Sequence, residues 1–134
     1  MKSTCKHQVI RRYDGSIEYE FWTRNWLKHR YSKPAYISYG YCNNVRSEEW
    51  RINGKLHRKN GPAYVKYYED GTVEAMNWYV NGKQHRMDGP TIIWYNRDGS
   101  INKELYYING ETLTKEQYLA WKRRNIIDKI LNDN

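Results

Sequence analysis

The chain has little of several residue types, and each shortage excludes a class of protein. Its 134 residues include two cysteines, three prolines and one phenylalanine. Cys5 and Cys42 are too few for a disulfide-dense secreted scaffold, and their spacing fits no zinc ligand set, so we expect reduced intracellular thiols. No apolar run approaches the about 18 residues of a membrane-spanning helix, and residues 1–12 contain no signal-peptide core. We therefore predict a cytoplasmic protein with no membrane attachment.

Aromatic residues are abundant, with 14 tyrosines and 6 tryptophans. The hydrophobic share of 39% is modest, but a large ring can bury about 150–250 Å² while its polar edge stays in water. Disordered chains are poor in aromatic residues. We therefore predict a folded chain, and its length favours a single domain over residues 1–134.

Positive charge is concentrated in the first half of the chain. Residues 1–68 carry 14 Lys and Arg against 5 Asp and Glu, a net +9, whereas residues 69–134 carry 9 against 10, a net −1. A basic half can steer a protein toward nucleic acid, acidic protein surfaces or anionic lipid. An ordinary solvated surface is the alternative interpretation.

A period of 28 residues runs along the chain. It is visible in Asn25, Asn53, Asn81 and Asn109; Trp22, Trp50, Trp78 and Tyr106; His29, His57 and His85; Arg30, Arg58 and Arg86; and Pro34, Pro62 and Pro90. A fixed period of about 20–50 residues indicates repeated units that bury their apolar faces against their neighbours. We predict repeats over residues 13–113, preceded by a half-unit at residues 1–12.

Strand and turn signals alternate within each unit. The pairs Asp14-Gly15, Asp70-Gly71 and Asp98-Gly99 predict two-residue type I′ hairpin turns, and Asn-Gly pairs beginning at Asn53, Asn81 and Asn109 form a second set of turns. Between them, residues 63–68, 73–80 and 91–95 are rich in β-prone residues. The pattern predicts two principal strands per unit and leaves open a short third strand at residues 83–85.

The period ends after residue 113, and residues 114–134 indicate a helix. Thr114 and Gln117 form a capping-box pattern, with Thr114 as the N-cap. The apolar stripe of this helix consists of Leu119, Ile126, Ile127, Ile130 and Leu131. We expect this helix to cover the last strand or part of a sheet face, because an exposed edge strand invites pairing with other chains. Binding of a partner by the helix is the alternative.

Two segments, Trp50 to Pro62 and Trp78 to Pro90, share the pattern Trp-Tyr-x-Asn-Gly-Lys-x-His-Arg-x-x-Gly-Pro most fully. This pattern resembles a MORN-like repeat variant of phage and giant-virus proteins, and it is similar to units of antitoxin-type proteins of the YwqK class. The Tyr-x-Gly-x-Trp core of ordinary MORN repeats is absent. The resemblance implies a mainly β fold: an elongated, twisted antiparallel β-meander or solenoid of 28-residue repeats, with the C-terminal helix as its cap.

The polar residues of the period do not predict an enzyme or a metal site. Equivalent residues of successive two-strand units lie about 10 Å apart, because neighbouring strands are about 4.8 Å apart. Three histidines at that separation cannot share one zinc ion. We instead expect each histidine to bond to backbone in its long turn and each following arginine to pack over a ring. No catalytic motif is present, so we predict neither catalysis nor a cofactor.

Aromatic residues that break the period suggest a binding surface in the basic half. We predict that it comprises Arg24, Trp26, Lys28, Arg30, Tyr31, Lys33 and Tyr41. Tyr, Trp and Arg commonly anchor protein interfaces, although the same mixture suits bases stacked beside neutralised phosphates. Trp26 and Tyr31 would be the anchors, and Arg24, Lys28 and Arg30 would guide the approach of the partner.

The functional hypothesis is therefore a non-enzymatic protein-binding repeat module. With the resemblance, it becomes a phage-encoded inhibitor of a host protein, such as a defence or CRISPR component or a nucleic-acid-associated protein, acting in the host cytoplasm. Two alternatives stay open: nucleic-acid or nucleotide binding through the basic aromatic half, and antitoxin-like neutralisation of a partner toxin. The oligomeric state is not predicted.

Overall fold

The computed structural model describes residues 4–133 and shows a mainly β protein with one C-terminal helix. Its large antiparallel sheet has ten strands, nine of which follow one another in chain order. These are β1 (Lys6–Arg11), β2 (Ile17–Arg24), β4 (Tyr36–Tyr39), β5 (Val45–Glu49), β8 (Tyr64–Tyr67), β9 (Val73–Asn77), β12 (Ile92–Tyr95), β13 (Ile101–Ile108) and β14 (Glu111–Leu113). The tenth, β3 (Leu27–Lys28), pairs with the end of β2. The ends of two predicted segments, residues 1–3 and residue 134, lie outside the described residues.

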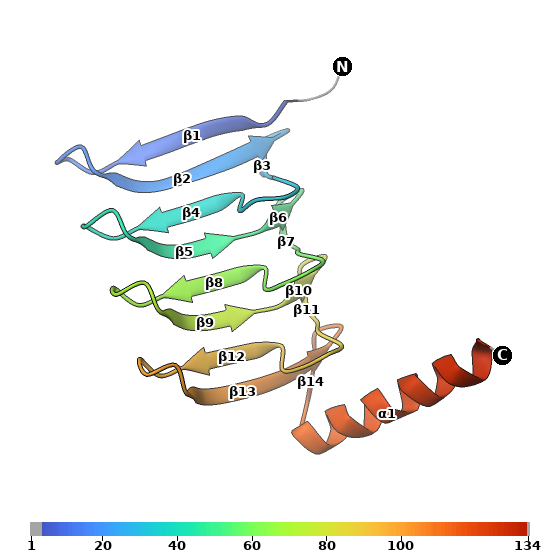
Figure 1. Cartoon of the computed structure of the whole chain (residues 1–134). Helices are drawn as coiled ribbons and strands as arrows, with labels where there is room; N and C mark the ends of the chain where they lie inside the picture. The colour runs from blue at the N-terminus through green and yellow to red at the C-terminus, as the bar shows by residue number, and fades with distance from the viewer. Residues whose placement is uncertain (1–3, 134) are drawn as a thin grey trace.

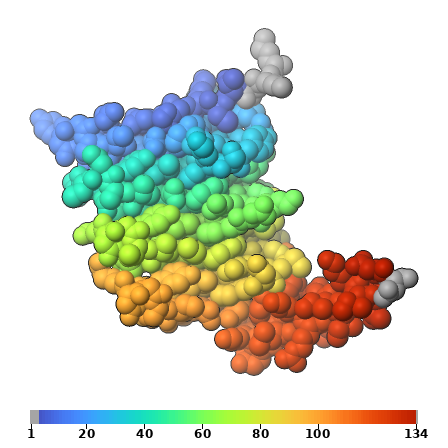
Figure 2. Space-filling view, viewed as in Figure 1, coloured from blue at the N-terminus to red at the C-terminus, as the bar shows by residue number. Residues whose placement is uncertain are grey.

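Two further hairpins stand beside the large sheet. They are formed by β6 (Arg51–Ile52) with β7 (Lys55–Leu56), and by β10 (Tyr79–Val80) with β11 (Lys83–Gln84). Figure 1 shows the long strands one below another, with their turns on one side and the short hairpins on the other. The space-filling view in Figure 2 shows the same order as successive bands. Strand β11 lies within residues 83–85, where the sequence analysis left open whether a short third strand forms.

The pairing register recurs at intervals of 28 residues. Phe21 lies opposite Tyr36, Glu49 opposite Tyr64, and Asn77 opposite Ile92. A one-residue shift of register also recurs, between residues 10/11, 38/39, 66/67 and 94/95. Strands β1, β4, β8 and β12 therefore occupy equivalent positions in the sheet.

The two kinds of turn differ from each other, and the Asp-Gly turns differ from the prediction. At Asn53-Gly54 both residues have positive φ, +48° and +81°, as a type I′ turn requires. At Asp70-Gly71 only Gly71 has positive φ, +84°, and the Asp70 carboxylate accepts a hydrogen bond from the Thr72 N–H at 2.9 Å. The type I′ prediction for the Asp-Gly pairs is wrong. The Gly71 N–H donates to the Tyr68 carbonyl at 3.1 Å, so Glu69 and Asp70 are the central residues of the turn and Gly71 follows them in the left-handed region, as in a three-residue hairpin loop.

The core is thin and combines small side chains with aromatic ones. Ala35, Ala63 and Thr91, at intervals of 28 residues, are fully buried. Backbone bonds on both sides fix this position: the Ala35 N–H donates to the Glu49 carbonyl at 2.7 Å, and its carbonyl accepts from the Trp22 N–H at 2.9 Å. A small residue fits between strands held this closely. Around Ala63, the central cluster comprises Trp50 and Val65, with Leu56, Tyr67, Val73, Met76 and Tyr79 packed against it.

Helix α1 (Lys115–Asn132) begins with the predicted capping box, since Thr114 accepts from the Gln117 N–H and Gln117 accepts from the Thr114 N–H. Buried Tyr118 packs on Tyr106, with ring centroids 4.8 Å apart, and its hydroxyl donates to the Met87 carbonyl at 2.9 Å.

The predicted contact of the helix with the end of the sheet is present, but it is made by Tyr118 and not by the apolar stripe. The stripe is exposed, with exposed fractions of 40–69% at Leu119, Ile126, Ile127, Ile130 and Leu131. Tyr118 lies on another side of the helix, because at 3.6 residues per turn its side chain points in a different direction from those of the stripe. Its contact with Tyr106 fixes the direction in which the helix leaves the sheet (Figure 1).

Candidate functional site

The histidines of the period join successive turns. The Nδ1 atom of each accepts a hydrogen bond, at 3.1 Å, from the backbone N–H of the asparagine 24 residues later. The pairs are His29 with Asn53, His57 with Asn81, and His85 with Asn109. Each histidine does bond to backbone, but the prediction that the partner lies in the histidine's own long turn is wrong, because the partner belongs to the next Asn-Gly turn. Residues 4–133 contain no group of three His, Cys, Asp or Glu side chains that could hold a metal ion.

The arginine after each histidine lies over the tryptophan eight residues earlier. The guanidinium carbon is 3.9 Å from the ring centroid for Arg30 over Trp22, 3.9 Å for Arg58 over Trp50, and 3.8 Å for Arg86 over Trp78. Each guanidinium also donates to the carbonyl of the proline four residues later. The predicted packing of arginine over a ring is confirmed. Arg30, a predicted binding residue, thus makes the same internal contacts as its two equivalents.

The first turn carries a tryptophan where the later turns carry glycine. In those turns a Cβ on the glycine would face a side chain of the preceding turn: Leu27 at 3.4 Å from Gly54, Lys55 at 3.5 Å from Gly82, and Lys83 at 3.9 Å from Gly110. The first turn has room for a side chain there. Trp26 fills it with φ of +66°, and 89% of its surface is exposed.

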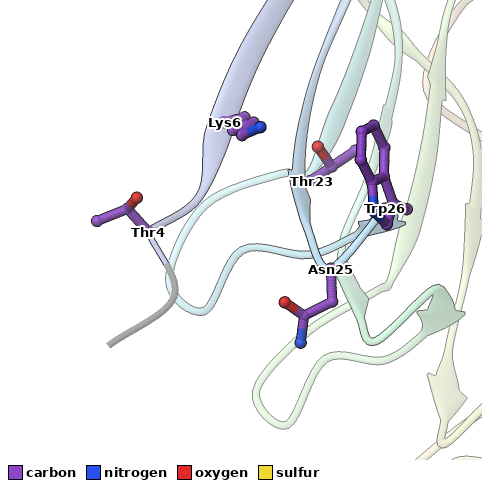
Figure 3. A pocket seen from close by; sticks show the side chains of 5 residues that line it. All are labelled: Thr4, Lys6, Thr23, Asn25 and Trp26. Carbon is purple, nitrogen blue, oxygen red and sulfur yellow. The ribbon is translucent and has the colours of Figure 1, made fainter. Parts of the chain in front are cut away.

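A small hollow of about 140 Å³ lies beside Trp26. It is lined by Thr4, Lys6, Thr23, Asn25 and Trp26 (Figure 3). The Lys6 ammonium is 5.4 Å from the centroid of the indole ring, within the range of a cation–π contact. The sequence analysis did not predict Lys6, Thr4 or Thr23 as binding residues. The only sequence signal for this part of the site was that Lys6 is a basic residue in the segment that becomes β1.

Tyr31 lies beside Arg24 and His29. The Arg24 guanidinium donates to the Tyr31 hydroxyl at 3.2 Å, and the Tyr31 ring meets the His29 ring edge-on at 4.6 Å. Tyr31 is 71% exposed, whereas His29 is fully buried. Burial lowers the pKa of His29, and the charge of Arg24 lowers it further. The imidazole is therefore held neutral, and Arg24 is the cation displayed here.

The two predicted lysines differ in their surroundings. The Lys28 ammonium lies 3.9 Å from the centroid of the Tyr36 ring, and burial lowers the pKa of Lys28. Lys33 is exposed in the loop before β4. Lys28 therefore supports the sheet, while Lys33 contributes charge to the surface.

Tyr41 is not brought together with the other predicted residues. Strands β2 and β4 are antiparallel, and Trp26 follows the end of β2 whereas Tyr41 follows the end of β4, so the two rings lie at opposite ends of the strands (Figure 1). Arg12 lies over the exposed Tyr41 ring, 4.8 Å from its centroid. Sequence order alone could not separate these two ends.

Two tyrosines on the sheet have altered titration for structural reasons. Burial, followed by a hydrogen bond to Glu20, raises the pKa of Tyr39 to about 12. Burial and a 2.7 Å bond to Glu48 raise the pKa of Tyr67 in the same way. Both phenols therefore remain protonated donors near neutral pH.

Two pairs of a cation and a ring lie at the end of β2 and in the residues that follow it: Lys6 with Trp26, and the partly buried Arg24 with Tyr31. Together with the exposed Lys33, these residues are called the Trp26 surface below. Aromatic residues and arginine of this kind suit recognition of a partner.

Within the described part of the chain, no helix is both long and apolar enough to cross a membrane. A comparison of the sequence and structure with protein families, curated proteins and solved structures finds no match.

Proposed function

We propose that this protein is a non-enzymatic binding module whose Trp26 surface binds another protein. Its sheet would be an open, elongated solenoid of MORN-like 28-residue repeats, closed at the C-terminal end by α1. The recurring contacts support this architecture: the pairing register, the histidine–asparagine bond and the arginine–tryptophan stack each return at intervals of 28 residues.

The observation that carries the proposal is the conformation of Trp26. A non-glycine residue in the left-handed region costs about 1–2 kcal/mol, and Trp26 has φ of +66°. A ring that is 89% exposed recovers little of that cost by burial in the folded chain. Strain kept at an exposed position supports a functional role. Burial of the ring by a partner would account for it.

The charges around Trp26 favour an acidic partner surface. Lys6 and Arg24 lie on the strands next to the turn, and Lys33 lies in the following loop. Exposed charges of one sign raise the rate at which an oppositely charged protein docks. In the host-inhibitor form of the proposal, suggested by the MORN-like resemblance, this partner is an acidic surface of a host protein.

Nucleic-acid binding is the second candidate, because an exposed indole ring beside a lysine can also stack on a base next to a neutralised phosphate. Lys6 and Trp26 provide that pair. The affinity of such binding falls steeply and linearly on a log–log plot against salt concentration. Titration with a single-stranded oligonucleotide at several salt concentrations tests it, and no binding at physiological salt would remove it.

Affinity capture with a matched set of variants tests the protein-binding function. Trp26→Gly removes the ring and supplies the glycine of the later turns, so the turn should stay folded. Tyr13→Ala removes an equally exposed ring from a turn at the other end of the strands. We expect wild type and Tyr13→Ala to capture the same protein stoichiometrically from a lysate, and Trp26→Gly to lose at least about tenfold of it, as for an interface anchor.

Tyr31→Ala provides an independent reading, since Tyr31 is exposed and its loss leaves the strand pairing intact. Its capture should fall as well, with an unchanged circular dichroism spectrum. Capture that is equal in wild type and Trp26→Gly would show that the contact surface lies elsewhere. No stoichiometric protein with any of the four chains would count against protein binding itself.

A further inference from the structure

Strand β1 is an open edge of the sheet. It heads the strand order and pairs with β2 on one side. All six of its residues are exposed, including Val9 and Ile10 at 37% each. An edge strand carries a row of backbone N–H and C=O groups that can pair with another chain.

The charge of this edge has one sign. Residues 4–13 contain Lys6, Arg11 and Arg12 and no Asp or Glu, while His7 is bonded to Glu20 of β2 at 2.7 Å. The hollow beside Trp26 includes Lys6, the first residue of β1, so the edge runs directly into the Trp26 surface (Figure 3). A segment lying along β1 would therefore meet positive charge and then the exposed ring.

Two junctions inside the sheet show which residue lies opposite the middle of a strand equivalent to β1. At the junction of β2 with β4, Glu20 lies opposite Ile37 and accepts a hydrogen bond from the Tyr39 hydroxyl. At the junction of β5 with β8, Glu48 lies opposite Val65 and accepts from the Tyr67 hydroxyl at 2.7 Å. At these two junctions the preceding strand presents a carboxylate to the tyrosine two places beyond the residue it faces. At the third junction, of β9 with β12, Met76 lies opposite Ile93 in the same place.

On β1 the equivalent residues are Val9 and Arg11, each 28 places before Ile37 and Tyr39, and the same register shift falls between residues 10 and 11. A strand added in this register places its central residue opposite Val9 and within reach of Arg11. A carboxylate there would accept a hydrogen bond from the Arg11 guanidinium, a charge-assisted pair in which both groups are ionised.

We propose that β1 binds an extended acidic segment of a partner protein as an added antiparallel strand, with a Glu or Asp opposite Val9 that bonds to Arg11. This inference rests on the proposed function and gives its partner a chemistry: an acidic β-strand that ends against Trp26. Backbone bonds would supply affinity, and the carboxylate and the ring would supply specificity.

A second copy of the chain fits this edge less well. Its β13 carries Glu104 at the position equivalent to Glu20 and Glu48, so its charge is suitable. However, Glu111 of that copy is equivalent to Leu27, and Trp26 is equivalent to Gly54. Leu27 lies 3.4 Å from a Cβ placed on Gly54, so Glu111 would have to lie equally close to the Trp26 side chain. The indole ring occupies this space. A separate segment without that turn avoids the clash.

The test uses a peptide with the sequence of residues 45–50, Val-Arg-Ser-Glu-Glu-Trp, which pairs in the required register inside the sheet. Titrated into the ¹⁵N-labelled full chain, it should shift the amide signals of residues 6–11 and the indole signal of Trp26. A peptide with lysine in place of both glutamates should leave them unchanged. Arg11→Glu should weaken binding about fivefold, the effect of one partly exposed ion pair, whereas Arg123→Glu on the exposed helix should not.

Each other outcome overturns strand addition. Absence of shifts at millimolar peptide, shifts confined to α1 or to other strands, or equal binding of the lysine peptide would do so. Concentration-dependent broadening of the free chain at β1 would identify a second copy as the occupant instead. If the peptide fails while Trp26-dependent capture succeeds, the partner surface stands without strand addition. If the peptide binds β1 while capture is independent of Trp26, the edge site stands and the proposed Trp26 surface fails.

Discussion

The middle of the sheet and its N-terminal end use equivalent positions for different purposes. In the middle, Trp50 is buried under Arg58, and the turn glycine Gly82 lies against Lys55. At the end, Trp22 is half-buried and Trp26, where the later turns have glycine, projects from the surface. Positions that hold the sheet together in its interior are available for recognition beside β1, the first strand of residues 4–133.

Replacement of the period's tryptophans should separate the two regions most clearly. Trp50→Ala should lower the free energy of unfolding by about 3–5 kcal/mol, the usual cost of removing a buried tryptophan, because Trp50 is 9% exposed and packs on Ala63 and Val65. Trp22→Ala should cost less, since that ring is half-buried. Urea denaturation of both variants measures the difference, and equal losses would show that the end of the sheet is as tightly packed as its middle.

Substitutions at two equivalent turn positions, Gly82 and Trp26, should change the free energy of unfolding in opposite directions. Gly82→Ala places a side chain at φ of +80° and 3.5 Å from Lys55, and should destabilise the protein by about 1–2 kcal/mol. Trp26→Gly relieves the strain of a side chain at positive φ, and glycine adds an entropy cost that offsets part of this gain. The net result should be a protein stabilised by about 0.5–1 kcal/mol. Thermal and urea denaturation test both. A destabilised Trp26→Gly chain would mean that the ring supports the fold.

The smallest effect should appear as pH dependence at the N-terminal end. His29 is neutral in the folded chain because burial and Arg24 lower its pKa. The unfolded chain therefore binds more protons below the ordinary pKa of about 6.5, so stability is full above that pH and falls as the pH drops below it. The slope cannot exceed about 1.4 kcal/mol per pH unit for one proton.

Unfolding measured between pH 7.5 and 5.5 isolates this histidine from the turn aspartates. The pKa values of Asp14, Asp70 and Asp98 are lowered from 3.8 by bonds to the residues two places later, so their contribution is complete in this range. In His29→Gln most of the slope should disappear. An unchanged slope would assign the pH dependence to other groups.

Sequence periodicity predicted the internal contacts well. A residue type repeated every 28 places must meet the same neighbours in each copy, so the packing of Arg58 over a ring followed from the spacing. The bond of His57 to the next turn did not, because the spacing does not say which turn lies beside the histidine. The type of each turn did not follow, because Asp-Gly and Asn-Gly read alike until the bond from Thr72 to Asp70 is known.

Direction in space was also hidden from the sequence. The sequence predicts that the helix covers the end of the sheet, but not that Tyr118 makes the contact with Tyr106 while the apolar stripe faces solvent. It also groups Tyr41 with Trp26, because both rings break the period in the basic half. Alternation of strand direction separates them by the length of the strands.

A sheet whose strands pair in chain order unfolds first at its outer strands. Within residues 4–133, β1 is joined to the sheet through β2, while β8 is held by a strand on each side. Amide hydrogens of β1 should therefore exchange with solvent soonest and those of β8 and β9 last. A ligand strand seated on β1 would lock the very end from which the sheet frays, so recognition there would also slow the loss of the whole structure.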